Sequence, residues 1–226
     1  MGNIQWEYIF DIELAFESIP YILRGLPYTL GIAFLSSFFG LILGLILAAM
    51  RISNISILDW LARTYISFMR GTPTLVLLFL LYFGLPFAGI QLQAITAAVI
   101  GFSISSAAYI SETIRSAIAS VPKGQWEAGY AHGLEWTFIM RKIVLPQGIR
   151  IAIPPLSNII LDVIKGTSLA AMITVPEMFQ NAKIVGGREF DYMTMYILVA
   201  LIYWGICSVF GLLQKHLEKH TSTYVN

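Results

Sequence analysis

Charged side chains are scarce in this sequence. Asp, Glu, Lys and Arg make up 12% of its 226 residues, whereas 57% of the residues are hydrophobic. With a mean hydropathy of +0.74, the chain is too apolar for a water-soluble domain, and we expect lipid to cover much of its surface. The formal net charge of +1 argues against a nucleic-acid partner, because binding a phosphate backbone takes clustered Lys and Arg.

Motifs that carry catalytic chemistry are also lacking. The one cysteine, Cys207, excludes an intrachain disulfide and a CxxC pair. The sequence has no Gly-Lys dipeptide and hence no phosphate-binding P-loop, so any ATP must be hydrolysed by a partner. His216 and His220 stand four positions apart, but Leu217 occupies the place of a zinc protease's Glu. We therefore predict a chain that is not an enzyme and that itself binds no metal or cofactor.

A positively charged segment is missing ahead of the first apolar stretch, so the sequence does not resemble a cleavable signal peptide there. Residues 1–24 instead interleave acidic and aromatic side chains: Glu7, Asp11, Glu13, Glu17, Trp6, Tyr8, Phe10 and Phe16. This composition predicts a short helix at the membrane interface, where amphipathic aromatic side chains settle. We expect residues 1–24 to form an extracytoplasmic interfacial segment.

Long charge-free stretches are what the sequence has in quantity. About 20 apolar helical residues cross the roughly 30 Å of bilayer hydrocarbon. Residues 25–50 and 192–214 each suit one crossing, and residues 71–111 suit two, with a turn at Gly84-Leu85-Pro86. We predict an all-α integral membrane protein with about five transmembrane helices, near residues 25–50, 64–84, 93–115, 152–175 and 192–214.

The distribution of Lys and Arg indicates which side of the membrane is cytoplasmic. Five crossings place the termini on opposite sides. With the N-terminus outside, the outer segments hold Arg24, Lys183 and Arg188. The inner loops and tail then hold Arg51, Arg63, Arg70, Arg115, Lys123, Arg141, Lys142, Arg150, Lys215 and Lys219. We expect an outside N-terminus, a cytoplasmic tail of residues 215–226 and a large cytoplasmic loop between the third and fourth spans.

That loop, residues 122–146, has a distinctive spacing. Glu127-Ala128-Gly129 is followed by Gly133 and then by Ile143-Val144-Leu145-Pro146. The pattern resembles the EAA loop of ABC importer permeases, with Gly129 in place of the second Ala. The resemblance implies two short coupling helices that dock in a groove of a cytoplasmic ATPase. Small residues admit a close partner surface, Glu127 offers a charged anchor and Gly133 lets the chain turn. An ordinary amphipathic helix ending at a proline is the alternative.

Resemblance within this family covers nearly the whole chain and points to permeases for polar amino acids. It is carried by residues 65–73, 112–116 and 165–169. Many such permeases have Asp where Gly166 stands, so the chain resembles those for cystine and related sulphur-containing amino acids. The resemblance implies a type I ABC importer permease fold in a bacterial cell membrane.

The same resemblance implies three kinds of partner. They are a cytoplasmic ABC ATPase dimer carrying ATP and Mg, a second permease subunit that is the same or a related chain, and an extracytoplasmic solute-binding protein. An ion-coupled secondary transporter of amino acids is the alternative function. It would usually show paired repeats, which we do not find in the sequence.

Candidate substrate-binding residues lie in the fourth span, where Asn158, Asp162 and Lys165 fall within about sixty degrees of one helix face. A charge at mid-membrane costs at least about 2.5 kcal/mol, so such residues normally face the protein interior and often mark a substrate path. A zwitterionic amino acid needs an acid such as Asp162 or Glu112 for its ammonium group, and a donor such as Lys165 for its carboxylate. A structural ion pair between Asp162 and Lys165 is the alternative.

Backbone-weakening residues suggest two further elements. Gly166, followed by Thr167 and Ser168, interrupts the fourth helix, and a broken helix aims N–H groups at an anionic ligand group. Pro73 removes one helical N–H close to Arg70 at the inner interface, which predicts an anchored kink that acts either in gating or only in packing. A GxxxG pair, Gly40 and Gly44, permits close helix contact, without indicating the partner.

Overall fold

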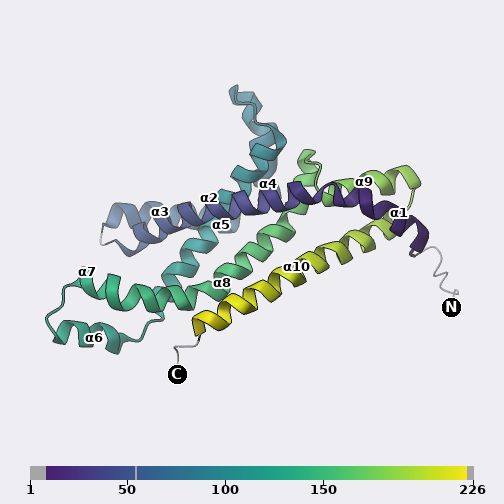
Figure 1. Cartoon of the computed structure of the whole chain (residues 1–226). Coiled ribbons are helices and arrows are strands. Elements are labelled where there is room, and N and C mark those ends of the chain that lie inside the picture. The colour runs from purple at the N-terminus through teal and green to yellow at the C-terminus, as the bar shows by residue number, and fades with distance from the viewer. Residues whose placement is uncertain (1–8, 54, 223–226) are drawn as a thin grey trace, which may run out of the picture. The chain divides into compact units, whose positions relative to one another are not determined.

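The computed structural model describes residues 9–53 and 55–222, with side chains placed up to residue 216. Within these residues every regular element is a helix (Figure 1). The α-helices are α1 (Ile12–Leu23), α2 (Leu26–Ile52), α3 (Ser56–Gly71), α4 (Thr74–Phe79), α5 (Ala94–Ala119), α6 (Lys123–Ala131), α7 (Trp136–Ile139), α8 (Leu145–Gly166), α9 (Met178–Glu189) and α10 (Tyr192–Ser222). The expected all-α class is confirmed, while Trp6, Glu7 and Tyr8 of the expected interfacial helix lie outside the described residues.

Four of the described helical stretches are long and apolar enough to cross a bilayer: Leu26–Ile52, Ala94–Ala119, Trp136–Ile173 and Tyr192–His216. The bent pair Ser56–Gly71 and Thr74–Ala88 raises the number to five if it counts as one span. Two helices extend beyond the expected spans at one end, since α8 begins at Leu145 and α10 continues to Ser222. Hydropathy marks only the apolar part of a helix, whereas helical hydrogen bonding continues until a residue interrupts it.

The expected second span, residues 64–84, is not one straight helix. Thr72 (φ −101°, ψ 127°) and Pro73 (φ −59°, ψ 131°) are both extended between α3 and α4. Pro73 explains the break, because a proline ring disfavours the helical conformation of the residue before it. The chain therefore bends sharply where we expected a kink.

The turn expected at Gly84-Leu85-Pro86 lies a few residues further on. The chain stays helical through the π-helical η2 (Leu80–Gly84) and the 3-10 helical η3 (Leu85–Ala88). Gly89 then ends the helix with a φ of 80°, a left-handed conformation that glycine adopts without steric cost. Pro86 closely follows the π turn of η2, because a ring without an N–H disfavours a regular α-helical turn ahead of it.

The chain folds as two compact units, of which unit 1 comprises the described residues up to 36 together with residues 73–102 and 161–211. The helix α1 packs against α9 in this unit (Figure 1). The Asp11 side chain caps α1 by accepting from the Leu14 N–H at 3.0 Å, and its own N–H donates to Thr194 Oγ1 at 2.9 Å. Side chains from α1, α9 and α10 form the core: Ala15, Ile22, Met178, Ala182, Val185, Met195, Leu198 and Val199.

Unit 2 comprises residues 37–72 and 103–160 and the chain from residue 212 onwards. Here the GxxxG pair of α2 meets α5. A Cβ on Gly44 would lie 2.6 Å from Cγ2 of Ile110, and a Cβ on Gly40 would lie 3.2 Å from the Ser103 carbonyl oxygen. The two glycines are therefore what lets the α2 and α5 backbones come close.

Candidate coupling loop and substrate path

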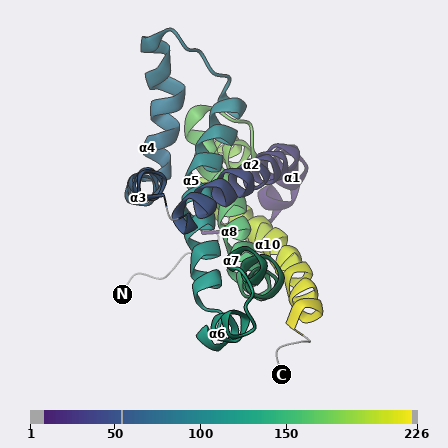
Figure 2. The ribbon, with the colours of Figure 1, turned by 90° about the vertical axis from the view of Figure 1, so that its left-hand side faces the viewer.

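The loop that resembles the EAA motif forms a helical hairpin within unit 2. The helices α6 and α7 lie beside each other in both views (Figures 1 and 2). Gly133 stands between them with a φ of 72°, so the reversal uses a conformation that favours glycine. A small core holds the hairpin together, consisting of Val121, Ile139, Met140 and Val144, with Trp126 and Leu134 packed against it.

The hairpin offers an exposed surface that includes several large apolar side chains. Glu127 and Ala128 are exposed on α6, whereas Gly129 is buried. Three aromatic residues are about half exposed on the same hairpin: Tyr130, Trp136 and Phe138. Gly129 faces inwards, where its missing Cβ leaves room for Ile139 of α7.

Leu145 and Pro146 do not terminate a helix at the end of the loop. They form the first turn of α8, which follows directly from α7 through the π-helical η4 (Met140–Val144). Pro146 explains the wider π turn, since its ring has no N–H to give to the carbonyl four residues earlier and crowds that carbonyl. The helix α7, expected as the second coupling helix, and the fourth span are therefore one continuous helical run.

The polar residues Asn158, Asp162 and Lys165 lie on α8, and two of them form an ion pair. Lys165 Nζ lies 2.8 Å from Asp162 Oδ1, and the side chains are 57% and 71% exposed, respectively. Asn158 accepts a long hydrogen bond of 3.4 Å from Gln214 Nε2 of α10. The geometry suits the structural ion pair that the sequence left open, while the exposure leaves the pair accessible from outside this chain.

The helix changes type at Gly166 and does not open. The α-helical α8 ends there and continues as the 3-10 helix η5 (Thr167–Ile173), so the expected break is a tightening of the helix. Thr167 is fully buried and donates to the Ile164 carbonyl at 2.7 Å. Ser168 is partly exposed and donates to the Lys165 carbonyl at 2.8 Å. Of these two hydroxyl groups, that of Ser168 lies nearer the surface.

Two cavities in unit 2 share the residues Arg70, Tyr109 and Glu112. The first, which we call the Glu112 cavity, measures about 340 Å³ and is lined in addition by apolar residues of α8: Ile151, Pro155 and Ile159. The second, the Arg51 cavity, measures about 540 Å³ and is lined in addition by polar residues: Arg51, Arg63 and Ser67. Glu112 and Arg70, which the sequence placed in different roles, thus line the same two cavities.

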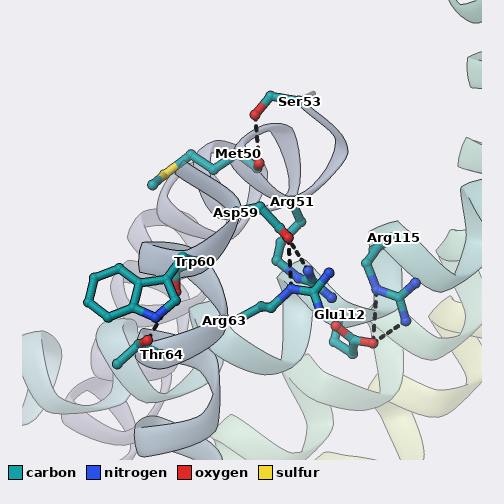
Figure 3. A network of polar contacts seen from close by, with 9 residues as sticks. All are labelled: Met50, Arg51, Ser53, Asp59, Trp60, Arg63, Thr64, Glu112 and Arg115. Atoms are coloured by element: carbon teal, nitrogen blue, oxygen red, sulfur yellow. Dashed lines mark hydrogen bonds and ion pairs between the residues drawn. The ribbon is translucent and has the colours of Figure 1, made fainter. Parts of the chain in front are cut away.

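Charged groups around these cavities are mostly paired, as Figure 3 shows. Asp59 accepts from Arg63 Nε at 2.8 Å and forms a second ion pair with Arg51. Glu112 binds Arg115 through one oxygen, Oε1, with Arg115 Nε at 3.0 Å. Arg70 differs from the paired arginines Arg51, Arg63 and Arg115, because its guanidinium lies over the Tyr109 ring, 5.7 Å from the ring centroid.

The remaining group, Pro73, lies at the extended break between α3 and α4 and only three residues beyond Arg70. Thr72 donates its hydroxyl to the Phe68 carbonyl at 2.8 Å, which satisfies one of the last carbonyls of α3. The expected gating role of Arg70 and Pro73 stays a prediction.

Sequence reasoning missed a buried acid and the helix that follows it. Residues 176–191 were expected as an outer loop, but they contain α9, whose buried positions Met178, Ala182 and Val185 follow a helical period that the sequence does show. Glu177 caps α9 and is completely buried. Burial raises the pKa of its carboxyl group, which hydrogen bonds from two backbone N–H groups and Tyr203 lower only in part. No local pattern distinguishes this acid from an exposed loop residue.

Comparison with known proteins identifies the family. The model of the binding-protein-dependent transport system inner membrane component matches residues 40–223. The chain is 60% identical over 225 residues to the probable amino-acid ABC transporter permease protein YckA of Bacillus subtilis (strain 168), covering 100% of both chains. It is 44% identical over 207 residues to the L-cystine transport system permease protein TcyB of the same organism, covering 91% of this chain and 88% of TcyB.

A solved structure gives the same result at the level of the fold. The crystal structure of an amino acid ABC transporter with histidines matches this chain with a TM-score of 0.89 and 33% sequence identity, covering 93% of this chain and 98% of that one. These similarities extend over nearly the whole chain and give no support to an ion-coupled secondary transporter. The chain therefore belongs to the binding-protein-dependent transport system inner membrane components, as a multi-pass amino-acid ABC transporter permease, a subunit that is not itself an enzyme.

Proposed function

We propose that this permease imports a polar amino acid along the polar face of α8, with L-cystine or a related sulphur-containing amino acid as its substrate. The observation that carries the path is the Asp162–Lys165 pair, which lies at the surface of an otherwise apolar span. In contact with lipid, each charge would cost at least about 2.5 kcal/mol. This surface therefore faces a water-filled path or another polypeptide. Asn158 and Ser168 extend the same polar region along the chain.

A zwitterion fits such a path because it can exchange with an existing ion pair. The ammonium group of the amino acid takes the place of Lys165 at Asp162, and the carboxylate takes the place of Asp162 at Lys165. The exchange replaces one charge pair by two, so little electrostatic energy is lost while the substrate is bound. When no substrate is bound, the Asp162 and Lys165 side chains satisfy each other's charge across 2.8 Å.

The Glu112 cavity supplies a second place with the same chemistry. Arg115 contacts only Oε1 of Glu112, and among the described residues Oε2 makes no hydrogen bond. The Arg70 side chain likewise makes no ion pair or hydrogen bond within the described residues, so its planar fork suits a carboxylate. We assign Glu112 to the ammonium group and Arg70 to the carboxylate of an amino acid at this place, with any gating by Arg70 and Pro73 following from that contact.

Cystine is the substrate we favour on two grounds. The L-cystine permease TcyB shares 44% of its residues with this chain, and Gly166 stands where many relatives of the polar amino acid type have Asp. Cystine also carries two ammonium and two carboxylate groups, so each of its ends presents the charges that the acid–base sites above recognise.

The hairpin of α6 and α7 is the part that we assign to coupling. The family implies an ATPase, a second permease subunit and a binding protein. We propose that a cytoplasmic ATPase dimer, which binds the ATP and Mg, docks on Glu127, Ala128 and the half-exposed Tyr130, Trp136 and Phe138. Because Leu145 and Pro146 belong to the same helical run as the fourth span, movement of the hairpin passes directly to α8.

This assignment requires the hairpin and the C-terminal tail in the cytoplasm and the N-terminus outside, where the solute-binding protein delivers the substrate. The excess of Lys and Arg in the inner loops supports that orientation. The second permease subunit, a copy of this chain or a related one, is expected to cover part of the exposed α8 surface.

Reconstitution tests the proposal. The permease, its ATPase and the binding protein are placed in lipid vesicles, and ATP hydrolysis is measured against a panel of amino acids. We expect cystine to stimulate hydrolysis more than any other amino acid, and stimulation by other amino acids without cystine would refute the substrate assignment. Asp162→Asn should abolish stimulation but keep the ATPase bound. Its control is Glu189→Gln, which removes another exposed ion pair, at Arg188 and outside the spans. Normal stimulation of Asp162→Asn would refute the path.

A further inference from the structure

Glu177 is buried more deeply than a helix cap needs to be. Its side chain is 0% exposed, although an acid can cap a helix from the surface. Its two oxygens accept three hydrogen bonds: Oε1 from the Gln180 N–H at 2.6 Å, and Oε2 from the Phe179 N–H and the Tyr203 hydroxyl, both at 2.8 Å. Burying an acid costs free energy unless all its oxygens are satisfied. The two backbone N–H groups already give each oxygen one hydrogen bond, so the contact with Tyr203 is additional to the helix cap.

The contact with Tyr203 connects α9 to the start of η5. The Tyr203 hydroxyl lies 3.4 Å from Thr167 Oγ1, and Thr167 in turn donates to the Ile164 carbonyl at 2.7 Å. All four residues belong to unit 1. The chain of contacts ends in the segment that carries Lys165 on one side and Ser168 on the other.

The same acid is held from a further direction. Gly25, at the junction of α1 and α2, packs so closely on the backbone at Glu177 and Met178 that a side chain there would overlap it. Thr29 of α2 is fully buried next to it and accepts a long contact of 3.5 Å from the Met178 N–H. The backbone that carries Glu177 is therefore held by the start of α2, while the carboxylate itself is held by α9 and α10.

Hydrogen counting shows why Tyr203 matters. The contacts that join Glu177 to Tyr203, Tyr203 to Thr167, and Thr167 to the Ile164 carbonyl need three hydrogens, while the two hydroxyl groups supply two. A protonated Glu177 supplies the third by donating to Tyr203 in place of accepting from it, and Tyr203 then donates to Thr167. Tyr203 is the link in either state, because its oxygen contacts both Glu177 Oε2 and Thr167 Oγ1.

We infer that Glu177 is a positioning residue that acts through Tyr203 to fix Thr167, and with it the turn from α8 into η5, in the geometry that presents Lys165 and Ser168 to the substrate. The inference rests on the proposed path along α8. It explains why the Thr167 hydroxyl is buried within a segment expected to bind substrate. Thr167 holds the segment in place, and Lys165 and Ser168 contact the substrate.

Tyr203→Phe is the decisive variant, because it removes one hydroxyl group and leaves the cap on α9 intact. The matched control is Tyr196→Phe, two turns earlier on α10, where the ring stacks on Phe179 and the hydroxyl takes no part in the network. Hydrogen exchange of the permease–ATPase complex follows the amides of residues 167–173. We expect about fivefold faster exchange there in Tyr203→Phe, from the loss of one hydrogen bond, and no change in Tyr196→Phe. Unchanged exchange in Tyr203→Phe would overturn the inference.

Binding of labelled L-cystine to the same complex, without the binding protein, separates this inference from the proposed path. Ser168→Ala tests the proposed substrate path along α8. If cystine binding is not weakened in Ser168→Ala, that result counts against the path but not against the contacts from Glu177 through Tyr203 to Thr167, which the hydrogen exchange of residues 167–173 tests separately. If Ser168→Ala weakens binding, Tyr203→Phe must weaken it as well, by about fivefold, with basal ATP hydrolysis unchanged. If Ser168→Ala weakens cystine binding, and Tyr203→Phe shows faster hydrogen exchange but unchanged cystine binding, the positioning role of Glu177 is refuted. Glu177→Gln should act in the same direction, because its NH2 group opposes the N–H of either Phe179 or Gln180.

Discussion

Gly129 of α6 and Ile139 of α7 fit together so closely that a Cβ on Gly129 would lie 2.7 Å from Cγ1 and 2.8 Å from Cδ1 of Ile139. Ile139 is completely buried in the hairpin core and has little room to move. The one departure from the EAA pattern therefore has an internal cause. The hairpin itself requires the small residue, whatever the partner's surface requires.

We predict that Gly129→Ala destabilises the hairpin by about 1–3 kcal/mol through overpacking, seen as weaker binding of the ATPase to the purified permease. The same substitution should cost less in an Ile139→Ala background, because the added methyl group then fills part of the cavity. A double-mutant cycle on ATPase affinity measures the difference. If Gly129→Ala reduced ATPase affinity equally with and without the Ile139 side chain, the small residue would be required by the partner's surface and not by packing against Ile139.

The GxxxG pair gives a prediction with a control on the same helix. Gly44→Ala should lower the thermal stability of the permease, because its Cβ would lie 2.6 Å from Ile110 Cγ2 and 3.1 Å from the Ala107 carbonyl oxygen. Gly31→Ala meets nothing within 4 Å and should be neutral or stabilising by up to about 1 kcal/mol. Unfolding in detergent, followed by scanning fluorimetry, compares the two variants. Equal shifts would exclude a packing role for Gly44.

Arg70 gives a prediction about substrate affinity. Arg70→Lys keeps the positive charge but loses the planar fork, so cystine binding to the permease–ATPase complex should weaken by about tenfold if Arg70 holds a carboxylate. Arg63→Lys is the control, since it makes the same change beside the same Arg51 cavity at a residue already paired with Asp59. Equal affinities of the two variants would remove Arg70 from the binding site.

Glu177 gives a prediction about pH. Burial raises the pKa of its carboxyl group above the usual 4.5, so the folded protein holds this proton more tightly than the unfolded chain. Its contribution to stability is therefore complete below pH 4.5 and is lost as the pH rises through the raised value. The difference in melting temperature between the native protein and Glu177→Gln should narrow as the pH rises from 4.5 towards 8. A difference that widens would show that the ionised carboxylate is the favoured form.

Much of the architecture follows from local sequence. Apolar stretches without charge locate the spans, since the cost of placing a charge in lipid is paid residue by residue. The spacing from Glu127 to Pro146 indicates the family, and Gly133 supplies the left-handed turn between α6 and α7. Each of these features depends on residues within one stretch of chain.

Features that join distant stretches were not predictable in this way. The partner of Gly40 and Gly44 is α5, some sixty residues further along the chain, and nothing in α2 names it. Pro73 predicts a kink, but how sharply the chain bends depends on both Thr72 and Pro73 being extended. Pairing of Asp162 with Lys165 was foreseeable from their spacing, whereas their exposure was not.

The sequence by itself determined an apolar, multi-span permease with a helical hairpin between its third and fourth spans, because hydropathy and turn chemistry act locally. Only the tertiary structure decided that Gly129 is small to make room for Ile139, that Arg70 and Glu112 share two cavities, and that Glu177 reaches Thr167 through Tyr203. These relationships arise when helix faces far apart in sequence pack together. Burial, which raises the pKa of Glu177 and commits its oxygens to fixed donors, is a property of that packing and of no single segment.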